Sequence, residues 1–291
     1  MKSDFFSLLF LFLSLAVSGA NAAEFLLVAN KQSPAVYLLI GGDITPGDYV
    51  QFVKQSKKAL GIIQHSNGSN NELVVAIDSA GGSLVEAIKI GTAIREMRLA
   101  TRIGTPFEIA QGAPFNQCMS ACLFMLAGGI IRDGPAADFS KVKIGIHRPS
   151  FDSSYFAKLS VKDAEKKFKL LEKVSRKYLT DMGLSESFVQ QMFAIPSTEM
   201  KFLDEEGFRK EFGNPPYYQE WIIANCGNRL NNAEEAIIAK YALAHVQGNK
   251  TSVSRSDADR LAAKDKTYRE CFKRTRLADQ LDSMQKYLSR M

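Results

Sequence analysis

Three segments of the sequence carry residues that together can cleave an acyl bond. The segments are AIDSAGGS at 76–83, CMSAC at 118–122 and IGIHRP at 144–149. A serine hydroxyl is a weak nucleophile at neutral pH unless a base such as histidine removes its proton. Paired glycines at a turn let a backbone N–H approach the oxygen that becomes charged in the reaction. The segments therefore predict Ser120 as nucleophile, His147 as base and the Gly82 N–H as an oxyanion donor.

The sequence around these segments alternates between two kinds of pattern. Apolar runs typical of buried strands cover 35–41, 72–78, 99–103 and 142–147, and apolar residues recur at helical spacing over 43–61, 83–97, 118–126 and 159–179. Such alternation is typical of an α/β domain with largely parallel strands. We therefore expect Ser120 at the start of a buried helix and His147 at the C-terminal end of a strand, where α/β proteins place their sites.

Each of the three segments also has a purely structural interpretation. A serine inside a helix can bond back to a carbonyl one turn earlier, a histidine can be a hydrogen-bonded structural residue, and paired glycines can form a tight connection. The glycines lack the spacing of a dinucleotide-binding or phosphate-binding loop, so no nucleotide is expected. Three histidines that group with no other ligands predict no metal and no other cofactor.

The first 22 residues have the features of a cleaved secretory signal. Lys2 precedes an apolar run from Phe5 to Val17, and small residues follow at Ala20 and Ala22. The run is shorter than the roughly 20 residues that a membrane-spanning helix needs, so cleavage is favoured over an uncleaved anchor. We expect a periplasmic or secreted protein that begins near Ala23 and has no transmembrane segment after cleavage.

Beyond the signal, the chain divides into two parts. Residues 23–213 are predicted to form the α/β domain, and NPPYY then precedes a helical C-terminal region over 214–291, with helices predicted over 220–246 and 257–287. The net charge is +6, and much of the basic excess lies over 158–177 and 264–276. Acidic residues are interleaved in both stretches, which favours solvated helix faces over an acidic or nucleic-acid partner.

The four cysteines allow three pairings in an oxidising compartment. The economical pairing joins Cys226 to Cys271 and Cys118 to Cys122. The second bridge requires Cys118 to lie just outside the regular helix, because an i to i+4 spacing within one helix is tight for a disulfide. A cysteine nucleophile is a lesser alternative, since an oxidising compartment consumes reactive thiols.

The stretch from about residue 36 to residue 213 resembles the proteolytic subunit of the Clp protease and, more broadly, the Clp protease/crotonase fold. AIDSAGGS is similar to that family's strand and Gly-Gly oxyanion turn, CMSACLFMLAGG to its nucleophile helix, and KVKIGIHRPSF to the strand that bears its base. The resemblance implies Ser120 as nucleophile and His147 as base, with the N–H groups of Gly82 and Ala121 as oxyanion hole. It also implies a β-α superhelical core and a homo-oligomer.

One matching segment departs from the family pattern. STEMKFLDEEGFRKEFG at 197–213 resembles the segment that carries the triad acid, but alignment on KFL places Met200 where the acid belongs. Glu199 is one residue away and can substitute only with a shifted backbone. We therefore expect a Ser-His dyad or a degenerate triad, in which Glu199 or a backbone carbonyl orients the imidazole.

These features predict an exported, ATP-independent serine peptidase-like hydrolase that acts on extended peptides laid beside the Gly-Gly turn. Met200 motivates the alternative of a non-catalytic peptide-binding or assembly protein that retains the fold. A crotonase-like enzyme acting on thioesters is disfavoured, because coenzyme A esters are scarce outside the cytoplasm. The loop over 104–117, with two prolines and two glycines, is predicted to be a lid over the site or a plain connection.

Overall fold

The computed structural model describes residues 22–29, 35–66, 72–104, 116–134 and 139–291. The predicted signal segment up to residue 21 and residues 105–115 of the predicted loop lie outside this range. The elements below are those of the described residues.

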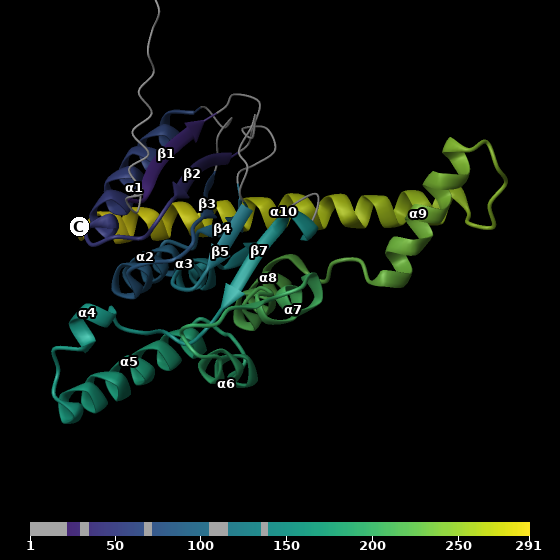
Figure 1. Ribbon diagram of the computed structural model, residues 1–291. Coiled ribbons are helices and arrows are strands. Elements are labelled where there is room, and N and C mark those ends of the chain that lie inside the picture. The colour runs from purple at the N-terminus through teal and green to yellow at the C-terminus, as the bar shows by residue number, and fades with distance from the viewer. Residues whose placement is uncertain (1–21, 30–34, 67–71, 105–115, 135–138) are drawn as a thin grey trace, which may run out of the picture.

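The main sheet has five strands in the order β1-β2-β3-β4-β6 (Figure 1). They are β1 (Glu24–Ala29), β2 (Ala35–Gly41), β3 (Glu72–Asp78), β4 (Ala100–Ile103) and β6 (Ile131–Asp133). The last four strands are parallel, and β1 pairs antiparallel along β2. The parallel strands β2, β3 and β4 match the sequence prediction closely because each is an apolar run buried between layers. The short strands β1 and β6 were not expected.

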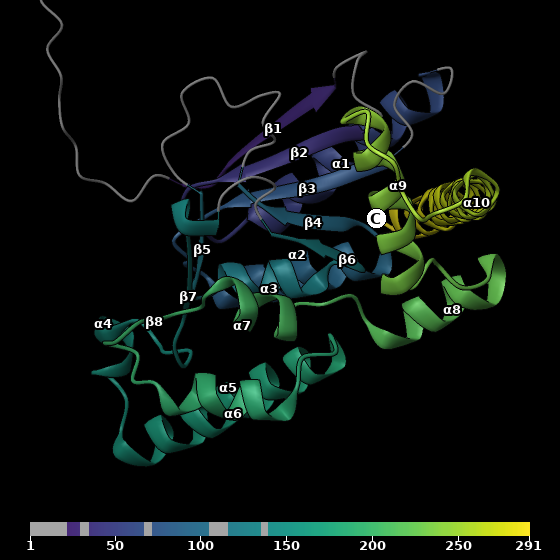
Figure 2. The same ribbon diagram turned by 90° about the vertical axis from the view of Figure 1, so that its right-hand side faces the viewer.

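Helices α1 (Asp48–His65), α2 (Leu84–Glu96) and α3 (Cys122–Gly128) pack with this sheet around one core (Figure 2). Every residue of α3 is buried. Helices α2 and α3 approach closely through two glycines, since a Cβ added to Gly128 would lie 2.2 Å from the Gly91 carbonyl oxygen. This contact fixes the direction of α3, and therefore of the turn that precedes it.

A second sheet has the order β5-β7-β8, formed by β5 (Asn116–Met119), β7 (Val142–Ile146) and β8 (Lys201–Phe202). Strand β5 is parallel to β7, and β8 is antiparallel to it. A single bridge between Ser79 and Cys118 joins this sheet to the end of β3. The helix predicted over 118–126 is therefore wrong at its start. Cys118 and Met119 belong to a strand, because they pair with β7, and the helix begins only at Cys122.

Further helices follow the second sheet. They are the 3-10 helix η1 (Phe139–Lys141), α4 (Ser153–Phe156), α5 (Val161–Asp181), α6 (Glu186–Ala194), α7 (Glu205–Glu211), α8 (Pro216–Cys226), α9 (Asn232–Val246) and α10 (Arg255–Leu288). The single helix predicted over 220–246 is broken, since α8 stops before Gly227 at a positive φ of 74° and Asn231 caps α9 with a capping box. Among these described helices none combines the length and apolarity needed to cross a bilayer.

The C-terminal helix α10 runs past the main sheet and joins its core (Figure 1). Gln280, which is buried, accepts a hydrogen bond from the Leu73 N–H at 2.8 Å and donates to the Leu73 carbonyl at 3.2 Å. Met284 and Leu288 are buried in the same cluster as the strands of the main sheet. The Cys226–Cys271 disulfide, as predicted, ties α8 to α10. A domain boundary at residue 213 stays a prediction.

Candidate active site

Ser120 lies in the turn that connects β5 to α3. Its φ is +53°, in the left-handed region that residues with a side chain rarely adopt and that costs about 1 kcal/mol. Its N–H donates to the Gly145 carbonyl on β7 at 2.9 Å. This backbone conformation keeps Ser120 out of the helix, and its side chain is only partly buried. A serine inside the buried helix, bonded back to a carbonyl, is therefore not what the structure contains.

Cys118 and Cys122 flank this turn and are joined by a disulfide, with their Cα atoms 5.2 Å apart. Cys118 lies in β5 beside Ile144 of β7, and Cys122 is the first residue of α3. Cys118 thus lies outside the helix, as the bridge requires. Both sulfur atoms are buried and bonded, so neither cysteine offers a thiolate nucleophile in this state.

The Gly-Gly turn after β3 is held from one side by Ile44. The Ile44 N–H donates to the Gly81 carbonyl, and the Ser83 N–H donates to the Ile44 carbonyl, each at 2.7 Å. In such a parallel bridge these groups flank Gly82, so the N–H and C=O of Gly82 itself point to the opposite edge. Gly82 has a φ of +123°, and a Cβ there would lie 2.3 Å from the Ile44 oxygen. Only glycine fits this position.

The opposite edge of the turn is next to Ser120. A Cβ added to Gly81 would lie 2.9 Å from the Ser120 Cβ and 3.3 Å from the Ala121 nitrogen. Within the described part of the chain, neither the Gly82 N–H nor the Ala121 N–H donates a hydrogen bond. Two backbone donors thus remain available beside the Ser120 turn, which is what the binding of an oxyanion needs.

His147 follows β7 directly and is half-buried. Its Nδ1 lies 3.0 Å from the Arg148 carbonyl oxygen. Because a carbonyl only accepts, Nδ1 carries the hydrogen and Nε2 keeps its lone pair. Burial lowers the pKa of His147 below its usual value, so the ring is neutral near pH 7. The imidazole therefore has the tautomer and the charge of a general base.

Ser120 directly follows β5, His147 directly follows β7, and these two strands are paired, but the two side chains are not hydrogen-bonded to each other. Met119 pairs with Gly145 in the β5–β7 register, and His147 follows two residues later. Among the described residues no hydrogen bond joins the Ser120 hydroxyl to the imidazole. Such bonds are often long in unliganded enzymes and shorten when substrate binds. The β5–β7 pairing thus brings the chain segments of Ser120 and His147 together, and the two side chains are not hydrogen-bonded to each other in this structure.

Gly145 pairs with Phe202 and Ile146 with Lys201, where the β7–β8 pairing ends. Met200 directly precedes β8 and lies beside Gly145, which is two residues before His147 in the sequence. Its sulfur would lie only 2.5 Å from a Cβ at Gly145. Glu199 is exposed, and its side chain makes no hydrogen bond to His147 within the described residues. The observed partner of Nδ1 is the Arg148 carbonyl, which the sequence analysis allowed without identifying.

Two buried arginines hold the far end of α3. The Arg95 guanidinium donates to the carbonyls of Ala127, Gly128 and Gly129 at 2.8 to 3.2 Å, and Arg132 Nε donates to Gly129 at 3.0 Å. Burial and the neighbouring Arg95 lower the pKa of Arg132 to about 9. Positive charge at a helix C-terminus stabilises the helix, so both residues help to fix α3, the helix that follows the Ser120 turn. Neither has a sequence signal beyond being an arginine among apolar residues.

Asp78, the last residue of β3, connects this strand to β5, which precedes Ser120. Its Oδ1 accepts a hydrogen bond from the Gln117 N–H at 3.2 Å. Burial nevertheless raises the pKa of Asp78 from 3.8 to about 6. The folded protein thus binds a proton at Asp78 more tightly than the unfolded chain does.

We expect the Asp78→Asn variant to be more stable than wild type at pH 7.5, by roughly 1–2 kcal/mol after allowance for partial exposure. The stability that the raised pKa provides is present below about pH 4 and is lost as the pH rises through about 6. Asparagine keeps an oxygen acceptor for Gln117 and carries no charge. Thermal unfolding of both proteins at pH 4 and pH 7.5 tests this expectation; a Tm difference of equal size at both pH values contradicts it.

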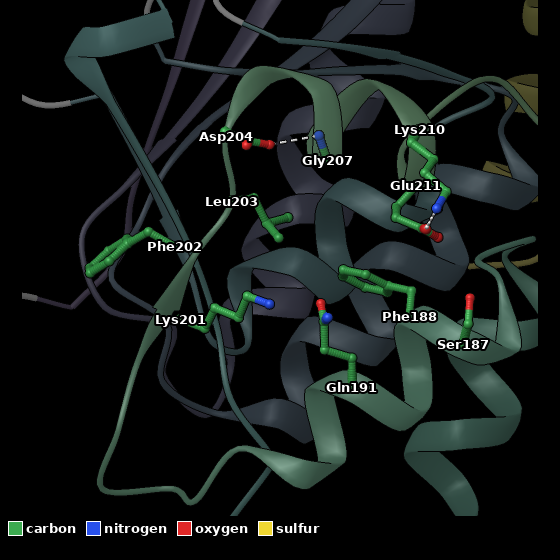
Figure 3. Close-up of a pocket in the computed structure, with 10 residues that line it drawn as sticks. All are labelled: Ser187, Phe188, Gln191, Lys201, Phe202, Leu203, Asp204, Gly207, Lys210 and Glu211. Atoms are coloured by element: carbon green, nitrogen blue, oxygen red, sulfur yellow. Dashed lines mark hydrogen bonds and ion pairs between the residues drawn. The ribbon is translucent and has the colours of Figure 1, made fainter.

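A pocket of about 430 Å³ lies behind β8, between α6 and the segment that leads into α7 (Figure 3). Lys201 and Gln191 point into it, whereas Phe202 points away. Its lining includes Asp204, Lys210 and Glu211, so it is polar and carries charges of both signs. Neither Ser120 nor His147 lines this pocket, which is therefore separate from the candidate active site.

Comparison of the sequence with protein-family models and with curated proteins gives no match. Among solved structures, the fold is similar to ClpP1 from Listeria monocytogenes, at 14% identity and a TM-score of 0.40, covering 62% of this chain and 88% of that one. A mutant of that ClpP1 is 15% identical, with a TM-score of 0.41, and the match covers 62% of this chain and 88% of the mutant. A mutant of a membrane-bound stomatin-specific protease is 17% identical, with a TM-score of 0.39, and the match covers 66% of this chain and 84% of that one.

Proposed function

We propose that this protein is an exported serine hydrolase of the peptidase type, with a Clp protease/crotonase-like core. Ser120 is the nucleophile, His147 the general base, and the N–H groups of Gly82 and Ala121 bind the oxyanion. The observation that carries the proposal is a pair of N–H groups that have no acceptor among the described residues and lie beside a serine at a φ of +53°. A structural turn has no need to keep two backbone donors free next to a strained serine.

In the reaction, His147 Nε2 takes the proton of the Ser120 hydroxyl as the oxygen attacks the substrate carbonyl carbon. The carbonyl oxygen becomes negatively charged and accepts hydrogen bonds from Gly82 and Ala121. The imidazolium then gives its proton to the leaving amine, and the acyl group stays on Ser120. Water, activated by the same imidazole, releases it. The Arg148 carbonyl keeps Nδ1 protonated throughout.

The open edge of Gly82 indicates how a substrate is held. Its N–H and C=O point away from Ile44 and have no partner among the described residues. An extended peptide pairs with such an edge as an added strand. The two disulfides are typical of proteins outside the cytoplasm, which agrees with action on exported or extracellular polypeptides without ATP. Homo-oligomerisation stays a prediction from the sequence resemblance, to be tested by light scattering.

A second candidate function is peptide binding or assembly without catalysis. Two observations favour it: Met200 stands where a carboxylate would orient His147, and Ser120 makes no hydrogen bond to the imidazole. The same open edge of Gly82 serves a binding protein equally well. The two functions differ in whether the Ser120 hydroxyl is activated.

Labelling with a fluorophosphonate probe separates these functions. Purified protein without its first 22 residues is expected to be labelled, and Ser120→Ala is expected to lose all labelling, because the phosphonyl group forms its bond to the activated serine oxygen. Ser150→Ala, an exposed serine three residues beyond His147, is the matched control and is expected to label like wild type. Folded wild type that takes up no probe contradicts the hydrolase and supports peptide binding.

A further inference from the structure

We propose that the Cys118–Cys122 disulfide positions Ser120 for catalysis, so that reduction of this bond lowers turnover while the protein stays folded. The inference rests on the proposed function, since it concerns the same serine. It assigns these cysteines a role beyond stabilisation.

Each end of the disulfide is attached to a rigid part of the core. Cys118 is held in β5 by its pairing with Ile144 and by the bridge to Ser79. Cys122 begins α3, whose seven residues are all buried. Only Met119, Ser120 and Ala121 lie between the two cysteines. The disulfide therefore sets the distance that these three residues span.

Within this short loop, Ser120 is held in a conformation that its backbone does not prefer. At a φ of +53° the Cβ of an L-residue is crowded, and an unconstrained chain relaxes to negative φ. Such a rotation would turn the hydroxyl of Ser120 and the following Ala121 N–H in new directions. The bond from the Ser120 N–H to the Gly145 carbonyl would have to break. The nucleophile and one oxyanion donor thus depend on the same crosslink.

The second disulfide provides an internal comparison. Cys226–Cys271 joins α8 to α10 across 45 residues, and both cysteines are partly exposed. Neither residue contacts the Ser120 turn. Because it closes the longer loop, this bridge restricts the unfolded chain more than Cys118–Cys122 does. Its reduction is expected to affect stability, whereas reduction of Cys118–Cys122 is expected to affect catalysis.

The redox step needs a two-electron donor such as the dithiol dithiothreitol. One thiolate of the dithiol attacks a sulfur of the disulfide and forms a mixed disulfide; the second thiolate then releases the other cysteine. The dithiol becomes a cyclic disulfide, and Cys118 and Cys122 each end as a thiol after gaining a proton. Both sulfur atoms are fully buried, so this reaction requires local opening and is slow compared with reduction of Cys226–Cys271.

The test uses a Cys226→Ala, Cys271→Ala variant, in which Cys118–Cys122 is the remaining disulfide. Turnover of a peptide substrate and the Tm are measured before reduction, after complete reduction by dithiothreitol, and after reoxidation. Reduction is expected to lower kcat by about 10²-fold, the size of loss that a misplacement of about 1 Å causes. KM is expected to change less than twofold, and reoxidation is expected to restore kcat. The Cys118→Ala, Cys122→Ala variant should show the lower kcat and no response to the dithiol.

Hydrogen exchange of the peptide over 119–123 gives a readout that is independent of activity. The Ser120 amide is expected to exchange at least tenfold faster after reduction, because its bond to Gly145 is lost. Unchanged kcat in the fully reduced protein overturns the proposal, and so does a loss of kcat that is matched by global unfolding. If oxidised protein neither turns over nor takes up the probe, the proposed function fails, and the exchange rate alone decides whether the disulfide holds the turn.

Discussion

The His147→Ala variant is expected to lose about 10³- to 10⁴-fold in kcat/KM, because the Ser120 hydroxyl then has no base to accept its proton. The residual rate comes from the oxyanion donors Gly82 and Ala121, which the substitution leaves in place. Labelling by the fluorophosphonate probe should slow by a similar factor. His147 is half-buried, and among the described residues its side chain bonds only to the Arg148 carbonyl. Folding should therefore be little affected, and circular dichroism checks this.

The pH dependence of wild type adds a second test of the same residue. A base acts in its neutral form, so kcat/KM rises with pH through the pKa of His147. Burial lowers that pKa, so the rise is expected below pH 6.5 and the plateau is reached by neutral pH. The rise should be missing from the residual activity of His147→Ala.

Matched variants separate this role from simple perturbation. His65 and His245 are exposed and distant in sequence, and their alanine variants should keep wild-type kcat/KM. Glu199→Gln is expected to change kcat/KM by less than threefold, because the Arg148 carbonyl, not Glu199, bonds to Nδ1. Full activity in His147→Ala contradicts the dyad; a large loss in Glu199→Gln contradicts the carbonyl as the orienting group.

The Met200→Asp variant is expected to be a better enzyme than wild type, by about 10²-fold in kcat. Extending the β7–β8 register by one residue beyond the Ile146–Lys201 pair would set residue 200 opposite His147, where we expect a carboxylate to accept from Nδ1–H. A carboxylate stabilises the imidazolium that forms during the reaction more than a neutral carbonyl does, and loss of such an acid elsewhere costs about 10⁴-fold. We expect a gain in kcat smaller than 10⁴-fold, because the Arg148 carbonyl already fixes the tautomer of His147.

Met200→Asn is the matched control, since asparagine has the shape of aspartate without its charge. The Asp variant should also raise the pKa of His147 and move the rising limb of the pH profile to higher pH, because a nearby negative charge favours the imidazolium. The Asn variant should show neither effect. Equal kcat and equal pH profiles in the two variants would mean that residue 200 does not reach the imidazole.

The parallel strands β2, β3 and β4 of the main sheet and the helices α1, α2 and α5 were predictable because their patterns are long and regular. The α/β class, the pairing of all four cysteines and the strand that precedes His147 are confirmed, whereas the Clp protease/crotonase-like core stays a proposal. Gly81, the neighbour of Gly82 in the Gly-Gly turn, lies next to Ser120 and Ala121. The catalytic roles of Gly82 and Ala121 stay proposals.

The remainder depends on contacts that pattern does not encode. Met119 and Cys118 look like the start of a buried helix, and only the β7 neighbour makes them a strand. The positive φ of Ser120 has no signal in residue type, since serine rarely adopts it. A sequence motif specifies side chains and not the positions of backbone groups. The Arg148 carbonyl, and not Glu199, as the partner of His147 Nδ1 could therefore be found only in the structure.

The side-chain amide of Gln280 makes two hydrogen bonds to the backbone of Leu73, as a neighbouring strand would. Leu73 lies near the start of β3, the strand that leads into the Gly-Gly turn. A chain synthesised only to the beginning of α10 leaves the Leu73 N–H and C=O without these partners and the core without Met284 and Leu288. The strand that leads into the Gly-Gly turn is thus completed by a residue that lies 207 positions further along the chain. Truncation of the chain before residue 280 is therefore expected to weaken β3 and, with it, the support of the candidate site.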